Sequence, residues 1–169
     1  SLHSKLPYYE GLMKNRFIFK TFLRPNQSVG LNLIKMKLNP IGHIVKDKEI
    51  ILIDDSIIRE TSISFHITAL KNAGAKKVHV RIACPPILFP CKFGINFEAS
   101  HKLYESVANL HHGNYEKIEE YIEAIKNEIG AETLKYLTFE DLNQSLGFKT
   151  TSICSGCLNN HYCIDKTEH

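Results

Sequence analysis

Two neighbouring carboxylates, Asp54 and Asp55, end an apolar stretch and are followed by residues that carry hydroxyl groups. Paired carboxylates in such a place suit a sugar diol or a hydrated magnesium ion. Ser56, Thr61 and Ser62, together with the backbone N–H groups between them, suit a phosphate at the start of a helix. A ligand that has both a diol and a phosphate is a ribose 5-phosphate. The alternative is that the two aspartates only cap a turn, but the whole combination favours the phosphate site.

The residues on either side predict the elements that position this loop. Residues 49–53 are almost continuously apolar and β-branched, which is typical of a parallel strand covered on both faces. Residues 62–73 carry apolar side chains at helical spacing, and Gly74 follows as a stop signal. Residues 77–83 read as the next strand. The predicted unit is strand, loop, helix, strand, and ligands of such α/β sheets bind at the carboxyl ends of the strands.

The cysteines form a second group of residues that could do chemistry. There are five, an odd number, and three are crowded near the C-terminus, so we expect a metal or cluster site rather than a disulfide framework. Cys154 and Cys157 have the Cys-x-x-Cys spacing that holds iron or zinc, and Cys91 is a third candidate ligand. Cys84 and Cys163 are the local candidates for a fourth. The alternative is a set of buried, inert thiols.

Composition bounds the rest of the interpretation. The chain has 169 residues, 43% of them hydrophobic and 23% charged, which is enough for one globular domain with a core. We expect residues 1–150 to form that domain and residues 151–169 a cysteine-bearing tail. The net charge of +3 is too small to indicate nucleic acid and suits an anionic small substrate. No apolar run approaches the roughly 20 residues of a membrane span, and no signal peptide opens the chain. Because the sequence begins with Ser1, we expect a fragment or a processed product.

Several other segments have weaker signals. Residues 17–38 show no period and read as a long loop of the kind that closes over active sites. The bases around it could clamp a pyrophosphate, although charge alone favours a solvated basic face. His111 and His112 fit an exposed loop better than a metal site. Helices are predicted at residues 100–110 and 115–128, the second with an apolar stripe, then a strand at residues 134–137 and a helix that a capping box opens at Thr138 and Gly147 ends. The stripe consists of Ile118, Ile122, Ile125 and Ile129.

The loop at Asp54 resembles that of the type I phosphoribosyltransferases, which bind phosphoribosyl pyrophosphate at a strand, Asp-Asp, loop and helix. A fuller resemblance, from Pro7 to about Tyr162, is to the amidophosphoribosyltransferases. It rests on separated motifs that occur in the same order. They are residues 7–16 (Pro-Tyr-Tyr-Glu-Gly-Leu-Met-Lys-Asn-Arg), 37–39 (Lys-Leu-Asn), 54–62, 73–77 (Ala-Gly-Ala-Lys-Lys), Pro85-Pro86, Pro90-Cys91, 93–95 (Phe-Gly-Ile) and the Cys154–Cys157 pair.

The resemblance implies an α/β fold, a type I phosphoribosyltransferase-like parallel sheet flanked by helices and incomplete at the N-terminus. It implies that Asp54 and Asp55 hold Mg²⁺ and the ribose hydroxyls, and that residues 14–23 belong to the closing loop. Arg16 and Lys37 would contact pyrophosphate. The segment that would cradle the 5-phosphate consists of Ser56, Ile57, Ile58, Arg59, Glu60, Thr61 and Ser62.

In the iron–sulfur branch of this family, cysteines that match Cys91, Cys154 and Cys157 hold a [4Fe–4S] cluster. The fourth ligand lies upstream of Ser1, which accounts for the missing partner better than Cys84 or Cys163. The resemblance also implies a glutaminase domain upstream in the full-length chain, a homo-oligomer and a cytoplasmic location.

The implied reaction forms 5-phosphoribosylamine from phosphoribosyl pyrophosphate and ammonia derived from glutamine, the first step of de novo purine synthesis. Catalysis there is mainly positioning and charge stabilisation, without a side-chain nucleophile. Because the glutaminase part is absent, we expect no glutamine-dependent activity from the isolated chain. Two alternatives stay open. One is another type I phosphoribosyltransferase, and the other is a non-catalytic remnant.

The chain departs from the family pattern at several positions. Glu60 stands where the family has a glycine that lets the backbone approach the phosphate, and its carboxylate adds repulsion. This departure is what favours the remnant. Phe19-Lys20 replaces a glycine-arginine pair, so the positive charge is kept while bidentate geometry is lost.

Overall fold

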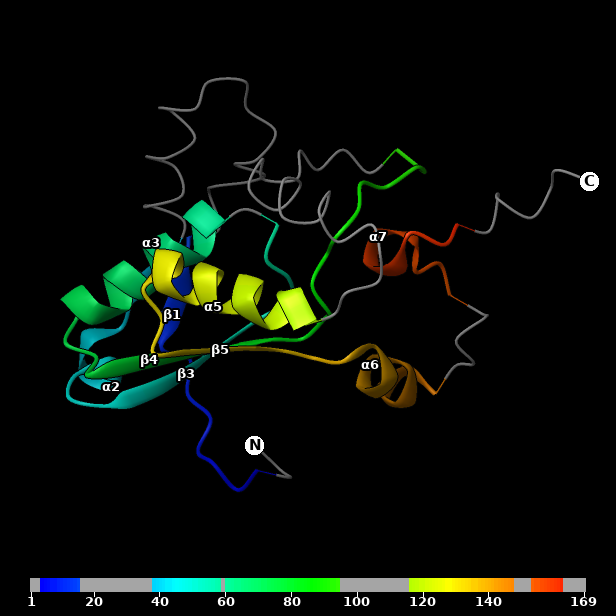
Figure 1. The fold of residues 1–169 in the computed structure, drawn as a ribbon. Coiled ribbons are helices and arrows are strands. Elements are labelled where there is room, and N and C mark those ends of the chain that lie inside the picture. Colours follow the sequence, from blue (N-terminus) through cyan, green and yellow to red (C-terminus); the bar gives the residue numbers. More distant parts are fainter. Residues whose placement is uncertain (1–3, 16–37, 59, 95–115, 148–152, 163–169) are drawn as a thin grey trace, which may run out of the picture.

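The structure is a computed structural model that describes residues 4–15, 38–58, 60–94, 116–147 and 153–162 (Figure 1). The predicted helix at residues 100–110, His111 and His112, and nearly all of the predicted loop at residues 17–38 lie outside these ranges. Among the described residues, no helix combines the length and the apolar character that crossing a membrane requires. In chain order the elements are β1 (Leu12–Lys14), β2 (Leu38–Pro40), α2 (Gly42–Val45), β3 (Glu49–Asp54), α3 (Glu60–Asn72), β4 (Lys77–Ile82), α5 (Glu116–Ile129), β5 (Thr133–Tyr136), α6 (Phe139–Leu146) and α7 (Gly156–Asn159).

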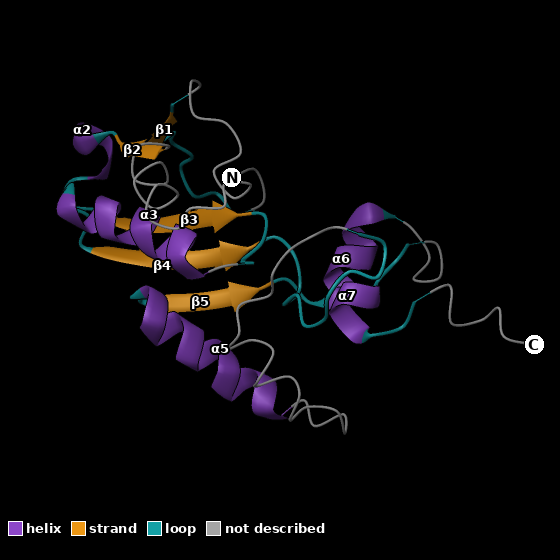
Figure 2. Cartoon of the chain, turned by 90° about the horizontal axis from the view of Figure 1, so that it is seen from above, coloured by secondary structure: helices purple, strands orange, loops and turns teal. Residues whose placement is uncertain are grey.

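A parallel sheet of order β3-β4-β5 forms the centre of the fold, and the predicted strands at residues 49–53, 77–83 and 134–137 are its members. The pairing runs from Glu49 opposite Lys77 to Asp54 opposite Ile82. All three strands therefore end at the same edge, beyond which α6 and α7 lie (Figure 2). A separate antiparallel ribbon of β1 and β2 was not predicted. The α/β class with a parallel sheet flanked by helices is confirmed.

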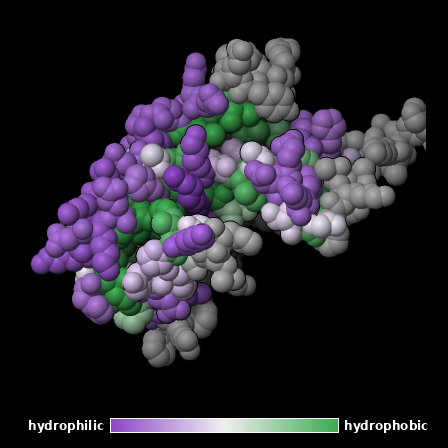
Figure 3. Space-filling model, turned by 90° about the horizontal axis from the view of Figure 1, so that it is seen from below, coloured by the Kyte–Doolittle hydropathy of each residue, from purple (hydrophilic) through white to green (hydrophobic). Residues whose placement is uncertain are grey.

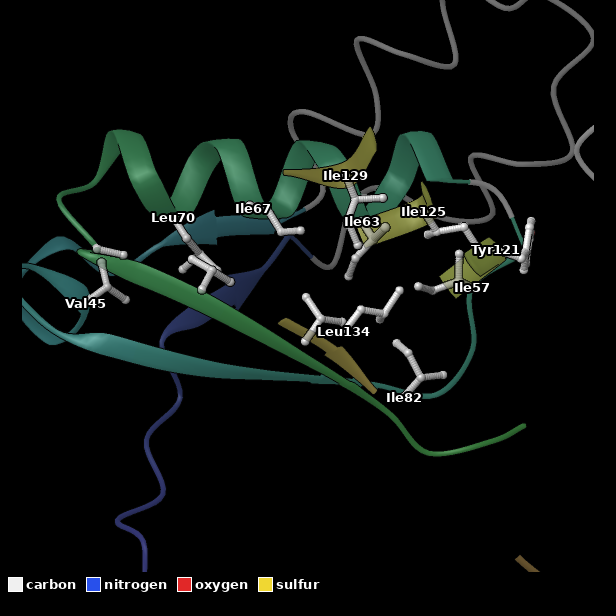
Figure 4. Close-up of a cluster of buried hydrophobic side chains, with 13 residues drawn as sticks. Val45, Ile57, Ile63, Ile67, Leu70, Ile82, Tyr121, Ile125, Ile129 and Leu134 are labelled. Carbon is white, nitrogen blue, oxygen red and sulfur yellow. The ribbon is translucent and has the colours of Figure 1, made fainter. Parts of the chain in front are cut away.

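The core lies between one face of this sheet and the helices α3 and α5 (Figure 4). The predicted stripe of α3, at Ile63, Ile67 and Leu70, is buried there. It faces the alternate residues of β4 that point to the same side. On α5 the buried stripe includes Tyr121, whereas Ile118 and Ile122 are only partly buried. The buried members of these strands and of α5 are Val78, Val80, Ile82, Leu134, Tyr121, Ile125 and Ile129.

The expectation that β3 is covered on both faces is wrong for the described residues. Ile50 and Leu52 pack against the core, but Ile51 is 43% exposed and Ile53 is 69% exposed. The reason is that α3 and α5 both cover the same face, which turns the intervening side chains of β3 outward. Apolar surface interrupts the polar surface on the side seen from below in Figure 3.

Polar side chains of β4 and β5 occupy the neighbouring positions of the open face. His79 Nδ1 lies 3.0 Å from Thr133 Oγ1, and Arg81 donates to the same oxygen over 2.9 Å. Lys77 forms an ion pair of 3.1 Å with Glu49, and its hydrogen bond holds the pKa of that carboxyl below its usual range. These pairs join neighbouring strands through side chains that alternate with the core residues and lie on the opposite face of the sheet.

Local signals set the ends of the helices as predicted. Thr138 Oγ1 accepts a hydrogen bond of 3.0 Å from Asp141 N at the start of α6, and Gly147 ends the helix in the left-handed conformation. Gly74, at φ 97°, follows α3, and its carbonyl accepts from Asp47 N over 2.8 Å. A side chain at Gly74 would meet Lys46. The stops at Gly74 and Gly147 are therefore confirmed.

Two isoleucines with opposite surroundings test this account of the core. We expect Ile67→Ala to lower the free energy of unfolding by about 2–5 kcal/mol, because the buried side chain leaves a cavity under α3. Ile53→Ala, the same chemical change on the open face, should change it by less than about 0.5 kcal/mol. Urea unfolding followed by circular dichroism measures both. Equal effects at the two positions would show that the open face of β3 is covered in solution.

Candidate functional site

The two aspartates of the predicted site lie at the carboxyl end of β3. Asp54 is the last residue of the strand, and its carbonyl accepts a hydrogen bond of 2.9 Å from Ala83 N, just past β4. Asp55 is exposed, and its Oδ1 accepts from the Ser56 hydroxyl over 3.0 Å. Asp54 Oδ1 accepts from Asp55 N over 3.0 Å. Both carboxylates are thus held at the sheet edge where ligands of α/β folds bind.

The segment between the aspartates and α3 buries one side chain in the core. Ile57 is in the core, close to Tyr121 in Figure 4. Its side chain therefore anchors the loop and leaves only its backbone for a ligand. Ile58 is partly buried, and Arg59 lies outside the described residues. The loop reaches the helix with its hydroxyl residues at the first turn of α3.

That first turn consists of Glu60, Thr61 and Ser62. Thr61 is exposed and Ser62 is partly buried, so both side chains stand where the helix has free N–H groups. The Glu60 carboxylate lies close enough to Tyr121 and Tyr136 for its charge to add to the burial that raises the pKa of both hydroxyl groups. The charge of Glu60 at the helix start thus acts on one buried and one partly buried tyrosine.

The basic residues assigned to pyrophosphate are not placed by the structure. Arg16 and Lys37 both lie outside the described residues. Residues close to them in sequence belong to the antiparallel ribbon, in which Lys14 at the end of β1 pairs with Leu38 at the start of β2. The assignment of Arg16 and Lys37 therefore stays a prediction.

The tail with Cys154 and Cys157 packs against the segment that leads to Cys91, which is far from it in sequence. Leu88 N and Phe89 N both donate to Cys157 O over 2.9 Å, which fixes the tail against the segment that precedes Cys91. Burial and the charges of Cys91 and Cys154 raise the pKa of the Cys157 thiol. All four described cysteines are free thiols. Within the described ranges, no three His, Cys, Asp or Glu side chains are grouped so that they could share one metal ion.

Cys84 lies within electrostatic range of residues from both predicted sites, which the sequence did not indicate. It follows β4, and its thiol donates to Pro85 O over 3.1 Å. Burial raises the pKa of Cys84 to about 11, and the charges of Asp55 and Cys157 add to this effect. Cys84 is therefore a neighbour of both the acidic loop and the cysteine group.

Labelling of Cys84 should depend on pH and on Asp55. Because burial favours the neutral thiol, we expect iodoacetamide to label Cys84 slowly at pH 8 and faster as the pH approaches 11. Asp55→Asn removes a negative charge that disfavours the thiolate, so the labelling curve should move to lower pH. Mass spectrometry of the labelled peptides measures this. Asp47→Asn, at an exposed position before β3, should leave the curve in place, and an unmoved curve in Asp55→Asn would refute the coupling.

Comparison with known proteins identifies relatives of this chain. No family model matches the chain. The amidophosphoribosyltransferase of Methanothermobacter thermautotrophicus is 39% identical over 159 residues, which are 94% of this chain and 31% of that protein. The amidophosphoribosyltransferase of Mycobacterium tuberculosis is 36% identical over 162 residues, 96% of this chain and 29% of that protein.

The structural comparison agrees with the sequence comparison. Glutamine phosphoribosylpyrophosphate amidotransferase from B. subtilis, solved in complex with ADP and GMP, matches with a TM-score of 0.70 and 35% identity. The match covers 95% of this chain and 33% of that one. The chain spans about a third of the length of the curated relatives it matches. Over nearly its whole length it is therefore homologous to part of the amidophosphoribosyltransferases.

Proposed function

We propose that this chain is the phosphoribosyltransferase part of an amidophosphoribosyltransferase and binds phosphoribosyl pyrophosphate at the loop after β3. The observation that carries the proposal is the Asp54–Asp55 pair at the carboxyl end of a parallel strand, from which residues 56–59 lead to the N-terminus of α3. Homology to amidophosphoribosyltransferases over 94% of the chain supports the same site. The reaction would form 5-phosphoribosylamine, the opening step of purine synthesis.

The reaction asks little covalent chemistry of the protein. The nitrogen lone pair of ammonia forms a bond to C1 of the ribose, the C1–O bond to pyrophosphate breaks, and the new amine loses a proton. The departing pyrophosphate carries most of the developing charge, so positioning and charge stabilisation dominate. In this chain Asp54 and Asp55 would orient the ribose, while the hydroxyl groups and N–H groups at the start of α3 would hold the 5-phosphate. Arg16 and Lys37 are the proposed pyrophosphate contacts.

The donors of the acidic loop fit magnesium. Mg²⁺ prefers hard oxygen ligands, keeps several waters and is usually held through one or two carboxylates and substrate phosphates. Asp54 and Asp55 supply adjacent carboxylates, and Asp55 is exposed enough to accept a hydrated ion. When bound, the ion would neutralise charge on the pyrophosphate.

The thiol donors of the cysteine group suit an iron–sulfur cluster, because soft thiolate ligands are those that hold such clusters. In a [4Fe–4S] cluster each thiolate binds a different iron, so the sulfur atoms stand farther apart than four ligands of one zinc. The charges of Cys91 and Cys154 both act on the Cys157 thiol, so the three thiols lie in one region of the described chain. We assign these three cysteines as cluster ligands. The fourth ligand and the ammonia-producing glutaminase domain would come from the rest of the full-length protein.

One observation favours a second candidate, a non-catalytic remnant that has lost its ligand. Glu60 places a carboxylate in the first turn of α3, where an anionic phosphate would bind. A negative side chain there stabilises the helix but competes with a phosphate for the same N–H groups. The charge of Glu60 also acts on the hydroxyl groups of Tyr121 and Tyr136, on α5 and β5. The effect of Glu60 on ligand binding decides between the candidates.

Calorimetry with phosphoribosyl pyrophosphate and Mg²⁺ tests the phosphoribosyl site. We expect binding by the parent chain and about a tenfold or greater loss of affinity in Asp54→Asn and Asp55→Asn, since each removes a charged ligand contact. Asp47→Asn is the matched control, because this exposed residue has φ 63°, which asparagine adopts readily, and its affinity should equal that of the parent. Binding that appears only in Glu60→Gly would support the remnant. No binding in either chain would refute the proposed site.

Anaerobic purification tests the cysteine assignment. We expect a brown protein that contains iron and acid-labile sulfide, and we expect both to be lost in Cys91→Ser, Cys154→Ser and Cys157→Ser, which replace soft sulfur ligands by oxygen. Cys84→Ser is the control that should retain them. Iron retained in all three ligand variants, or lost equally in Cys84→Ser, would contradict this assignment and favour another type I phosphoribosyltransferase.

A further inference from the structure

The tail that carries the Cys-x-x-Cys pair is fastened to the segment around Cys91 by backbone hydrogen bonds. Cys157 O accepts from both Leu88 N and Phe89 N over 2.9 Å. The start of the short helix α7 is fixed by two backbone hydrogen bonds, which Leu158 N and Asn159 N donate to Ser155 O. These bonds place one carbonyl of the tail, but they leave the rotation of the tail about this point to be set by side chains.

Tyr162 supplies that second attachment. Its side chain is 3% exposed, and its hydroxyl donates to Pro90 O. The ring centroid lies 6.0 Å from that of Phe93, and Lys92 Nζ lies 4.6 Å from the ring centre. Tyr162 therefore contacts residues immediately before and after Cys91, although Cys91 is separated from it by most of the C-terminal half of the chain.

The same ring rests on the turn between the two tail cysteines. A Cβ atom built on Gly156 would lie 2.3 Å from one ring carbon of Tyr162 and 2.4 Å from another. Such a distance is far below van der Waals contact, so the ring occupies the space that any side chain at position 156 would need. Gly156 is buried and lies between Cys154 and Cys157. One ring thus touches both parts of the chain that bring cysteines together.

We propose that Tyr162 is a positioning residue for the cysteine group, which it holds assembled by joining the Gly156 turn to the backbone on both sides of Cys91. A thiol set that is already in place spares the cost of ordering the tail when its ligand binds. This role rests on the proposed cluster, but the attachment itself is a property of the chain without iron. It lies outside the core of the sheet, since Tyr162 does not belong to the cluster of core residues around Ile67.

Bridging of thiols tests the attachment without iron. In the 169-residue chain carrying Cys84→Ser, Cys154→Ser and Cys163→Ser, the remaining pair is Cys91 and Cys157. Dibromobimane, which fluoresces when it bridges two nearby thiols, should bridge them. Tyr162→Ala should slow bridging by about tenfold or more, because removal of a buried ring is a large truncation. Gly156→Ala should slow it as well, because its methyl group displaces the ring.

A double variant separates this mechanism from general damage. If Gly156→Ala acts through the ring, it should have no further effect in the Tyr162→Ala background, and the two changes should be strongly non-additive. Tyr162→Phe keeps the ring and loses only the hydrogen bond to Pro90 O, so its bridging should fall between those of the parent and Tyr162→Ala. Tyr8→Ala, at an exposed tyrosine, should bridge as the parent does. Parent-like bridging in Tyr162→Ala, or equal slowing in Tyr8→Ala, would overturn the proposal.

Cluster loading distinguishes the proposal from the function on which it rests. The parent cysteines are restored, and iron and sulfide are measured after anaerobic reconstitution. We expect Tyr162→Ala to load several-fold more slowly than the parent, while circular dichroism shows the same helix content. A parent that takes up no iron would refute the cluster, whereas the bridging result would still stand for the attachment. Slow bridging with parent-like loading would refute the positioning role.

Discussion

The parallel pairing of β3 with β4 is the constraint on which the rest of the structure depends. Because successive side chains of a strand point to opposite faces, the pairing of Ile50 with Val78 and of Leu52 with Val80 commits one face to the helices. The same register brings Asp54 level with Ile82 at the last pair of the ladder. A slip by one residue would expose the buried set and displace both carboxylates from the sheet edge. The hydrophobic core therefore sets the position of the acidic loop.

Much of this could be predicted because the signals are local. The spacing of Ile63, Ile67 and Leu70 predicts α3, and Thr138 and Gly147 mark the ends of α6, since helix periodicity and capping are read within a few residues. The cover over β3 could not be predicted in this way. An apolar run is equally compatible with one covered face or two, and the exposure of Ile53 depends on which elements pack there. The ribbon of β1 and β2 was missed because strands of three residues, far apart in sequence, leave almost no pattern.

The two parts of the candidate site differ in the same respect. Asp54 and Asp55 stand next to each other in sequence, so their joint role follows from a motif and the strand before it. The approach of Cys91 to Cys157 depends on hydrogen bonds from Leu88 and Phe89, which are made by the backbone and leave no trace in residue type. The sequence offered Cys91 as a third candidate ligand, and the family resemblance assigned it together with Cys154 and Cys157. The resemblance marked Glu60 as a departure but did not indicate which residues its charge reaches. These include Tyr121 on α5 and Tyr136 at the end of β5.

The carboxyl end of β4 is where the two parts meet. Ala83 N binds the carbonyl of Asp54, and the next residue, Cys84, lies within the electrostatic reach of both Asp55 and Cys157. From there the chain continues to Leu88 and Phe89, which hold the tail. Burial remains the larger cause of the raised pKa of Cys84, so the charges modify a thiol that its surroundings already keep neutral. The acidic loop and the cysteine group are thus built outward from one strand end, and a displacement of β4 would move both of them together.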